Sequence, residues 1–375
     1  MHIAIIGAGI TGLMSALELL EQGCSVTIFD QQVAGKAASW AGGGILSPMY
    51  PWRYPAAVNT LARHAKPLYQ DWNQKLQPVT GIDFQIHESG MLIFDEADFE
   101  IGLCYAGKYQ DPQQQAELLD QTQLQQINPR IDQRKFQQAI YFPELANIRN
   151  PRLLQSVISY LKQHPHVTWQ EHCKITQLNI QQGWVTSVSS ESGQHFQADQ
   201  FVIATGAWSA GWSEQLGCEI PVQPVQGQML LFKTPENWLP SMCMNKVMYL
   251  IPRRDGHVVC GSSMRQVGFD TSPSAEIRQD ILQACLEMVP ELADFPLVKQ
   301  WAGLRPSSPD GIPYIGKIPE LQNTWANFGH FRNGLCMAPA SGKLLAQLML
   351  EQTPTIVDPQ PYAPAHLLEP GRLVL

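Results

Sequence analysis

The chain has 375 residues, of which 44% are hydrophobic and 15% are charged, and its formal net charge is −8. This composition is that of a globular protein with a large core, and the length allows two domains or one domain with a second lobe. A net negative charge argues against electrostatic attraction to nucleic acid or to an anionic membrane surface. We therefore expect neither nucleic acid nor a membrane among the partners.

The N-terminal segment and the cysteines indicate a cytoplasmic protein. MHIAIIGAGITG lacks a basic leader, and no apolar run reaches the length of a membrane span. The eight cysteines are scattered and form no CxxC pair, so neither a zinc site nor a dithiol centre is indicated. Cysteines in apolar runs such as VVCG are expected to be buried and reduced. We predict no metal site.

The first thirty residues carry the pattern of a dinucleotide-binding βαβ unit. The apolar run HIAIIG predicts a buried parallel strand, and GAGITG then places Gly7, Gly9 and Gly12 in the spacing G-x-G-x-x-G. A helical pattern follows and stops at Gly23, and the next apolar run, SVTIFD, ends at Asp30. In such a unit the glycines make the turn, admit a pyrophosphate and let the helix pack, while the acid accepts hydrogen bonds from a ribose. The spacing alone leaves NAD and FAD as alternatives.

Later segments favour FAD and predict further strands. SWAGGGILSP contains Gly42, Gly43 and Gly44, and three consecutive glycines permit backbone to approach something flat closely. FVIATGAWS is another buried-strand run that ends in a turn of small residues, as expected for a strand that completes a flavin domain. The alternation in KVMYLIPRRDGHVVCGSS predicts antiparallel strands joined by a hairpin turn at Asp255-Gly256.

Together these stretches resemble the D-amino-acid oxidase superfamily of FAD enzymes, and most closely its glycine oxidase group, which is associated with thiamine synthesis. The resemblance covers nearly the whole chain, through GAGITG, SWAGGGILSP, ATGAWS, PVQPVQGQM, MYLIPRRDG, GSSM, WAGLRPSSPDGIPYIG and GHFRNGLCMAP. It implies an α/β fold, in which a Rossmann-like FAD-binding domain is combined with a discontinuous substrate domain on an antiparallel β-sheet. The expected ranges are 1–80, 147–215 and 305–375 for the FAD-binding domain, and 81–146 and 216–304 for the substrate-binding domain.

The resemblance also implies that FAD is bound noncovalently. Some relatives attach the flavin through a cysteine in the segment that corresponds to GLRPSSPDG, where this chain has none. The implied cofactor-binding residues are Gly7, Ala8, Gly9, Ile10, Thr11, Gly12, Asp30, Ser39, Trp40, Ala41, Gly42, Gly43, Gly44, Ile175, Thr205, Gly206, Ala207, Trp208, Arg305, His330, Arg332, Asn333, Gly334 and Leu335.

A small pocket for an amino acid is implied next to the flavin. Arg332 in GHFRNG and Arg305 in GLRP resemble the arginines that face the substrate, and a guanidinium suits a carboxylate because it donates two parallel hydrogen bonds and stays charged. Tyr249 in MYLIP resembles a tyrosine that hydrogen-bonds the carboxylate, and Met264 in GSSM resembles an apolar wall. Each also has a structural interpretation, as a solvated arginine or an ordinary core side chain.

The reaction implied is oxidation of the substrate by hydride transfer from its α-carbon to flavin N5. The resulting imine hydrolyses to the oxo acid and ammonia, and dioxygen reoxidises the flavin to yield hydrogen peroxide. No side chain is assigned as a catalytic base, because the bound amine can lose its proton to water. The segment MAPASGKLLAQLML predicts a helix with Pro339 near its first turn, whose N-terminal dipole would support negative charge on the reduced flavin.

Several alternatives remain open at this point. Glycine, sarcosine and small D-amino acids all offer a carboxylate and an amine, and an extra methyl group changes binding by only about 1–3 kcal/mol. The main alternative function is an FAD-dependent D-amino-acid dehydrogenase that passes electrons to a quinone. Oxidation of N-methyl groups or of a modified nucleobase, and a flavin scaffold without turnover, are further alternatives. Relatives are often homotetramers, so a homo-oligomer is also implied.

Overall fold

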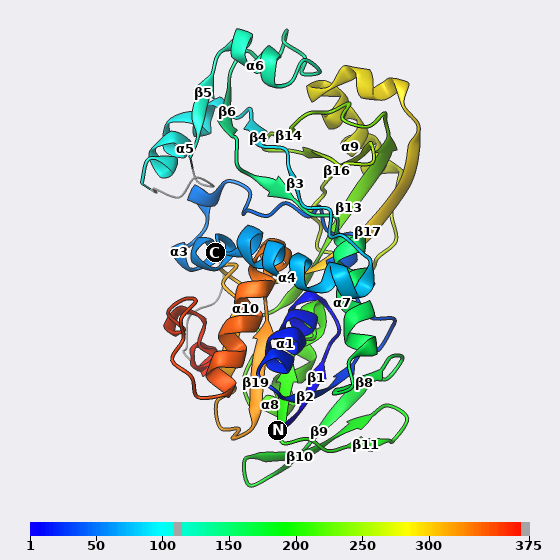
Figure 1. Cartoon of the computed structure of the whole chain (residues 1–375), viewed down its shortest axis with the longest axis vertical. Coiled ribbons are helices and arrows are strands. Elements are labelled where there is room, and N and C mark those ends of the chain that lie inside the picture. Colours follow the sequence, from blue (N-terminus) through cyan, green and yellow to red (C-terminus); the bar gives the residue numbers. More distant parts are fainter. Residues whose placement is uncertain (109–114, 369–375) are drawn as a thin grey trace.

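Two large β-sheets lie at opposite ends of the long axis of the molecule (Figure 1). The computed structural model describes residues 1–108 and 115–368 of the chain. One sheet has six strands and the other has eight, and helices lie between and around them. The fold is therefore of the predicted α/β class.

The six-stranded sheet is parallel except at one edge. Four neighbouring strand pairs run parallel, and the edge pair β18–β19 is antiparallel. In spatial order the strands are β18 (Tyr314–Lys317), β19 (Thr324–Phe328), β12 (Gln200–Ile203), β1 (His2–Ile6), β2 (Ser25–Phe29) and β8 (Val167–Gln170). A three-stranded meander of β9 (Ile175–Gln181), β10 (Trp184–Ser190) and β11 (His195–Phe196) lies beside it.

Strand β1 is buried on both faces, which explains its uninterrupted apolar sequence. Ile3 and Ile5 pack into the core under the helices, whereas Ala4 and Ile6 pack into a second core shared with the meander. Parallel strands covered on both faces have this composition. The local sequence HIAII therefore specifies a central strand.

Helix α1 (Ile10–Glu21) ends in the way its sequence predicts. Gly23 has a left-handed φ of 78°. Its N–H donates to Leu20 O at 2.9 Å, and the N–H of Cys24 donates to Leu19 O at 3.1 Å. This is a Schellman arrangement, which satisfies the last carbonyl groups of the helix.

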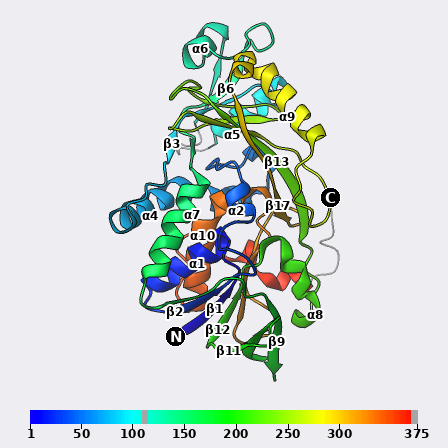
Figure 2. The same ribbon diagram turned by 90° about the vertical axis from the view of Figure 1, so that its right-hand side faces the viewer.

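The eight-stranded sheet is antiparallel at every strand pair except β14–β4. The predicted hairpin joins β15 to β16, and Gly256 in its turn has a φ of 76°. Figure 2 shows the long paired strands β13 and β17 extending from this sheet toward the six-stranded sheet. The strand order is β17 (Leu297–Ser307), β13 (Gln223–Lys233), β16 (His257–Gly261), β15 (Tyr249–Pro252), β14 (Met242–Met244), β4 (Met91–Ile93), β6 (Ala139–Phe142) and β5 (Glu117–Leu119).

The remaining elements connect and cover these sheets. A short pair joins β3 (His87–Glu88) to β7 (Ala146–Asn147). The other α-helices are α2 (Ala38–Ala41), α3 (Ala56–Ala62), α4 (Ala65–Thr80), α5 (Phe99–Ala106), α6 (Gln121–Ile127), α7 (Asn150–Gln163), α8 (Ser213–Leu216), α9 (Ala275–Met288) and α10 (Gly334–Met349). The 3₁₀ turns are η1 (Pro51–Arg53), η2 (Glu96–Asp98), η4 (Gly206–Trp212), η5 (Pro290–Asp294), η6 (Phe331–Asn333), η7 (Gln360–Tyr362) and η8 (Pro364–Leu368).

The two faces of the eight-stranded sheet have different partners. Leu230 and Leu250 on one face pack with residues of α9, including Ile281. Met229 and Tyr249 on the other face belong to a separate cluster with residues of the loop after α2, such as Tyr50. The second face is therefore the one turned toward the rest of the chain.

The strands of the two large sheets come from different parts of the chain. Every strand of the six-stranded sheet lies in 1–80, 147–215 or 305–375, and the eight-stranded sheet lies in 81–146 and 216–304 except for the last three residues of β17. The domain boundaries themselves stay a prediction. Residues 109–114 and 369–375 of the predicted domains lie outside the described residues.

No helix in the described ranges is both long and apolar enough to cross a bilayer. All eight cysteines are free thiols, and seven of them are buried as expected. Cys104, which lies on α5, is exposed instead.

Helix α10 begins earlier than the sequence predicts, at Gly334, so that Pro339 lies inside the helix and not in its first turn. Proline has no N–H to donate to the carbonyl of Leu335, four residues earlier. The hydroxyl of Tyr69 on α4 donates to that carbonyl instead, at 2.7 Å. A side chain from another helix thus replaces the missing backbone hydrogen bond, which sequence pattern alone does not reveal.

We predict that Tyr69→Phe destabilises the protein by about 1–3 kcal/mol, because it leaves the half-buried Leu335 carbonyl without a donor from the protein. The free energy of unfolding should be measured by chemical denaturation. Tyr160→Phe is the control, since Tyr160 is half-buried and its ring contact with His164 does not need the hydroxyl. Equal stabilities of the two variants would contradict the role given to Tyr69.

Candidate active site

A cavity of about 450 Å³ is lined by residues from both large sheets. It brings together segments from nearly the whole length of the chain, from Ile6 to Cys336. The predicted site residues that line it are Gly7, Gly9, Ile10, Thr11, Asp30, Ser39, Ala41, Gly42, Gly43, Gly44, Ile175, Thr205, Gly206, Ala207, Trp208, Tyr249, Arg305, His330, Arg332, Asn333, Gly334 and Leu335.

The glycine turn at one end of the cavity has the geometry expected of a dinucleotide site. Gly7 has a φ of 112°, and a Cβ there would lie 2.3 Å from Ala204 O. A Cβ on Gly12 would lie 2.0 Å from Gly7 O, so this glycine lets α1 pack on the strand. A Cβ on Gly9 would meet only Ser39 Oγ, at 3.5 Å. Gly7 and Gly12 are thus required by the protein's own packing, whereas Gly9 leaves space open toward the cavity.

Asp30 is held in place at the end of β2. Its carboxylate accepts from the backbone N–H of Ala8 at 2.9 Å and from that of Gln32 at 2.8 Å. Burial raises the pKa of Asp30, while these two N–H groups act in the opposite direction. The carboxylate is therefore oriented by backbone donors and lies where a ribose hydroxyl would donate.

The triple-glycine loop forms a second wall. Gly44 has a φ of 79°, and a Cβ there would lie 2.2 Å from Ile148 O. Asn150 donates from Nδ2 to Ser39 O at 2.9 Å and to Gly42 O at 3.0 Å. The loop is therefore fixed by the start of α7, more than a hundred residues later in the chain.

Two buried amide atoms on the cavity wall lack hydrogen-bond partners among the described residues. They are Oδ1 of Asn150 and Nδ2 of Asn333, and both residues line the cavity. Buried polar atoms are almost always paired, so an unpaired acceptor and an unpaired donor on one cavity wall indicate a bound polar group. Together with the open space at Gly9, they fit a dinucleotide cofactor such as FAD.

His330 is a neutral, fixed part of the wall. It is 1% exposed, and burial lowers its pKa to about 3. Ser341 Oγ donates to Met337 O at 2.9 Å, so His330 Nε2, which lies 2.9 Å from that hydroxyl, is assigned as the donor. A neutral ring with this hydrogen bond leaves Nδ1 as its acceptor.

Two guanidinium groups face the cavity near Tyr249. Arg305 donates from Nη2 to Ser262 Oγ at 2.6 Å and from Nη1 to Ser263 O at 3.1 Å. Burial lowers the pKa of Arg305, contact with Tyr249 opposes this, and the charge of Arg332 adds to the lowering. Two nearby cations, one of them held by neutral partners, make this part of the wall electropositive.

Arg332 itself is exposed and lies in the turn η6 just before α10. Its Nη2 is 4.0 Å from Met49 Sδ, a weak contact that leaves its donors available to a ligand. The structure thus places Arg332 beside the start of a helix, as the sequence suggests.

A glycine in β13 makes room for Arg305. A Cβ on Gly227 would lie 2.2 Å from Arg305 Nη2. A glycine inside a strand commonly marks such a close approach. Gly303 in β17 likewise lets α2 approach the strand closely, because a Cβ there would lie 2.4 Å from Ala41 Cβ.

Four predicted site residues do not line the cavity, so the predicted set of wall residues is corrected at these positions. Met264 is 60% exposed, so in this structure it is not the apolar pocket wall that GSSM suggests. Trp40 packs edge-on against Trp301 at 5.6 Å and forms part of the joint between α2 and β17. Ala8 and Gly12 are buried behind the turn.

Sequence reasoning missed several lining residues, among them Met49, Asn150, Gly227 and Gly303. The two strand glycines carry a usable signal, because glycine weakens a strand unless something approaches it closely. Met49 and Asn150 carry no such signal, since their place depends on how distant segments pack.

Comparisons with known proteins agree with this geometry. The family model described as "FAD dependent oxidoreductase" matches residues 2–348. The chain is 41% identical over 363 residues to the glycine oxidase of Pseudomonas putida, covering 97% of this chain and 98% of that protein. It is 30% identical over 357 residues to the bifunctional protein ThiO/ThiG of a Nostoc species, covering 93% of this chain and 53% of that protein. The crystal structure of glycine oxidase from Geobacillus kaustophilus superposes with a TM-score of 0.88 at 25% identity, covering 96% of this chain and 97% of that one.

We predict that Gly9→Ala weakens FAD binding by roughly tenfold or more without unfolding the protein, because its new methyl group enters the open side of the turn. FAD affinity should be measured by flavin fluorescence and folding by circular dichroism. Gly12→Ala is the matched comparison and should destabilise the whole protein, since its Cβ would collide with Gly7 O. Unchanged FAD affinity in Gly9→Ala would contradict this placement of the cofactor.

Proposed function

Because the chain belongs to the family of FAD-dependent oxidoreductases, we propose that it catalyses the oxidative deamination of glycine. It is an FAD-dependent amine oxidoreductase, and the relatives named glycine oxidase support glycine as a substrate. The proposal includes sarcosine and small D-amino acids as further substrates, with the oxo acid, ammonia and hydrogen peroxide as products. The resemblance to the glycine oxidase group supports a role for this reaction in thiamine synthesis.

The observation that carries this proposal is the pair of arginines beside Tyr249. Arg305 and Arg332 line one cavity, and their charges are close enough for Arg332 to affect the pKa of Arg305. A site with two cations and a hydroxyl favours a small anion, and a carboxylate matches the planar donor fork of a guanidinium.

The residues would divide the work of holding the substrate. Arg332, whose donors are available, would grip the carboxylate, and Tyr249 would donate its hydroxyl to the same group. Tyr249 Oη lies 3.4 Å from Met229 Sδ, a weak acceptor, so the hydroxyl can turn to a better one. Arg305 would contribute chiefly through its charge, since two of its donors already bind Ser262 and Ser263.

Holding the substrate in one orientation accounts for the protein's share of catalysis. When binding fixes the reacting atoms, the translational and rotational entropy is lost on binding, so this loss no longer adds to the barrier of the chemical step. FAD, when bound, supplies the acceptor for the two electrons of the substrate's carbon–hydrogen bond. Gly9, Asp30, Asn150 and Asn333 would hold it, as their geometry in the cavity suggests.

We predict that glycine, sarcosine and small D-amino acids bleach the bound flavin under anaerobic conditions, while L-amino acids with larger side chains do not. Absorbance of the oxidised flavin measures this directly. Oxygen consumption and peroxide formation in air should then exceed turnover with an artificial dye under argon.

Two outcomes would contradict the proposal in different ways. A flavin that stays oxidised with every amino acid would indicate a protein without this activity. Rapid dye reduction with little peroxide in air would indicate a dehydrogenase that uses another electron acceptor.

We predict that Arg332→Ala raises the KM for glycine by about 30- to 150-fold, because losing a charged donor pair to a carboxylate costs about 2–3 kcal/mol. FAD should stay bound, since the residues proposed to hold it do not include Arg332. Steady-state kinetics and the flavin absorbance of the purified variant measure the two effects.

Arg265→Ala provides the control, because Arg265 is an exposed arginine that does not line the cavity. Its KM should be close to that of the wild type. A loss of FAD from Arg332→Ala in proportion to its loss of activity would place Arg332 at the cofactor and not at the substrate.

A further inference from the structure

Arg253 is the most deeply buried cation near the cavity, and the proposed reaction does not use it. It follows β15 in the hairpin and is 6% exposed. Its guanidinium donates from Nη1 to Asn147 Oδ1 at 2.6 Å and to Ile148 O at 2.7 Å, and from Nη2 to Gly43 O at 2.6 Å. All three acceptors are neutral, so this arginine is not simply half of an ion pair.

The acceptors belong to the two segments that build the triple-glycine wall. Ile148 N donates to Gly44 O at 2.8 Å, and Leu46 N donates to Ala146 O at 2.9 Å. Arg253 therefore donates hydrogen bonds to both of the segments that these backbone hydrogen bonds join. Charge-assisted hydrogen bonds to carbonyl groups are stronger than neutral ones, so the bridge restrains the loop.

The same face of β15 also reaches the cavity at its other end. Residues alternate along a strand, so Tyr249 and Ile251 share one face of β15, and Arg253 continues this alternation just beyond the end of the strand. A Cβ on Gly43 would lie 2.8 Å from Ile251 Cδ1 and 3.2 Å from Tyr249 Cε2. One strand face thus contacts the cofactor wall through Ile251 and Arg253 and presents Tyr249 to the cavity.

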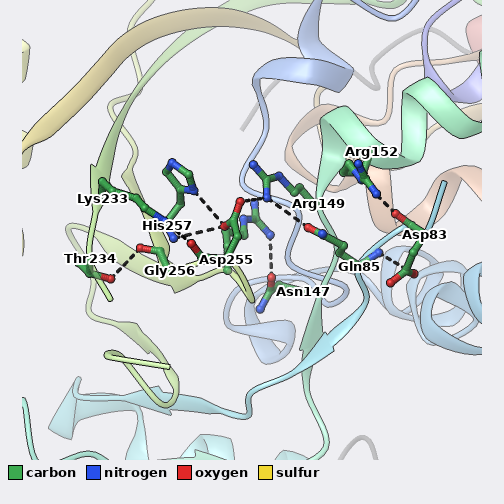
Figure 3. Close-up of polar contacts among 11 residues, drawn as sticks. Asp83, Gln85, Asn147, Arg149, Arg152, Lys233, Thr234, Asp255, Gly256 and His257 are labelled. Atoms are coloured by element: carbon green, nitrogen blue, oxygen red, sulfur yellow. Dashed lines mark hydrogen bonds and ion pairs between the residues drawn. The ribbon is translucent and has the colours of Figure 1, made fainter. Parts of the chain in front are cut away.

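Arg253 stays protonated at neutral pH in spite of its burial. Burial lowers the pKa of Arg253 to about 9, Arg149 adds to the lowering, and Asp255 opposes it. Asp255 lies between Arg149 and His257 in the same hairpin (Figure 3), with its Oδ1 2.9 Å from His257 Nδ1. Burial raises the pKa of Asp255, but His257 and Arg149 lower it to about 2. A carboxylate therefore remains near the buried cation at neutral pH.

We propose that Arg253 is a positioning residue, which holds the triple-glycine wall of the cofactor cavity in register with the strand that carries Tyr249. Its guanidinium fork reaches two segments at once, which a single point charge does not do. The inference rests on FAD binding and not on the identity of the substrate. A negative result in the substrate test would therefore not contradict the role proposed for Arg253.

The test compares Arg253→Met and Arg253→Lys with Arg254→Met. Arg254 is the neighbouring residue of the same hairpin, and its side chain is 50% exposed. It forms an ion pair with Asp83, with 3.0 Å between Arg254 Nη1 and Asp83 Oδ2, and this pair does not involve the glycine loop. Each holoenzyme is dialysed, the fraction of FAD retained is measured by fluorescence, and the visible spectrum of the bound flavin is recorded. Circular dichroism follows unfolding separately.

Arg253→Met should raise the FAD dissociation constant by roughly tenfold or more and shift the flavin spectrum, because the Gly43 and Ile148 carbonyls lose their charged donor. Arg253→Lys should recover part of the affinity. Arg254→Met should match the wild type in both measurements.

A folded Arg253 variant with the wild-type dissociation constant and spectrum would overturn the proposal. So would an equal loss of FAD from Arg254→Met, because the effect would then belong to the hairpin as a whole. If Arg253→Met fails to fold, Arg253→Lys decides: weaker FAD binding supports the proposal, and unchanged binding shows that Arg253 serves folding alone.

Discussion

The close contact between strand β15 and the triple-glycine loop is the constraint on which the site depends. Gly43 has no side chain, and a Cβ there would lie only 2.8 Å from Ile251 Cδ1 and 3.2 Å from Tyr249 Cε2. A larger residue would separate the eight-stranded sheet from the cofactor wall. Because the loop also lines the cavity, this one contact sets the distance between the two ends of the site.

The arginines around the cavity differ in how their charges are satisfied. Arg253 is enclosed by neutral acceptors and belongs to the framework. Arg305 is partly satisfied by Ser262 and Ser263, and Arg332 is exposed with only a weak contact to Met49. A buried, satisfied cation stabilises structure, whereas a cation with free donors can exchange water for a ligand. This gradient runs from the framework toward the proposed substrate position.

The start of helix α10 shows how a binding surface can be supported from behind. Pro339 removes one backbone donor, and Tyr69 from α4 replaces it. His330 is kept neutral by burial and held by Ser341 of α10. The loop that carries Arg332 and Asn333 is thus held by hydrogen bonds to α4 and to the body of α10. Such contacts restrict its motion and keep the cavity wall in one arrangement.

The sequence by itself determined the βαβ unit, the Schellman end of α1 and the hairpin at Asp255-Gly256, because each signal lies within about thirty neighbouring residues. Through the resemblance to a family it also identified part of the cavity wall. Only the tertiary structure decided that Met264 is exposed, that Trp40 packs on Trp301, and that Gly227 makes room for Arg305. These outcomes depend on which strands and helices meet across hundreds of residues. Local propensity and spacing carry no information about such tertiary contacts, because long-range packing decides them.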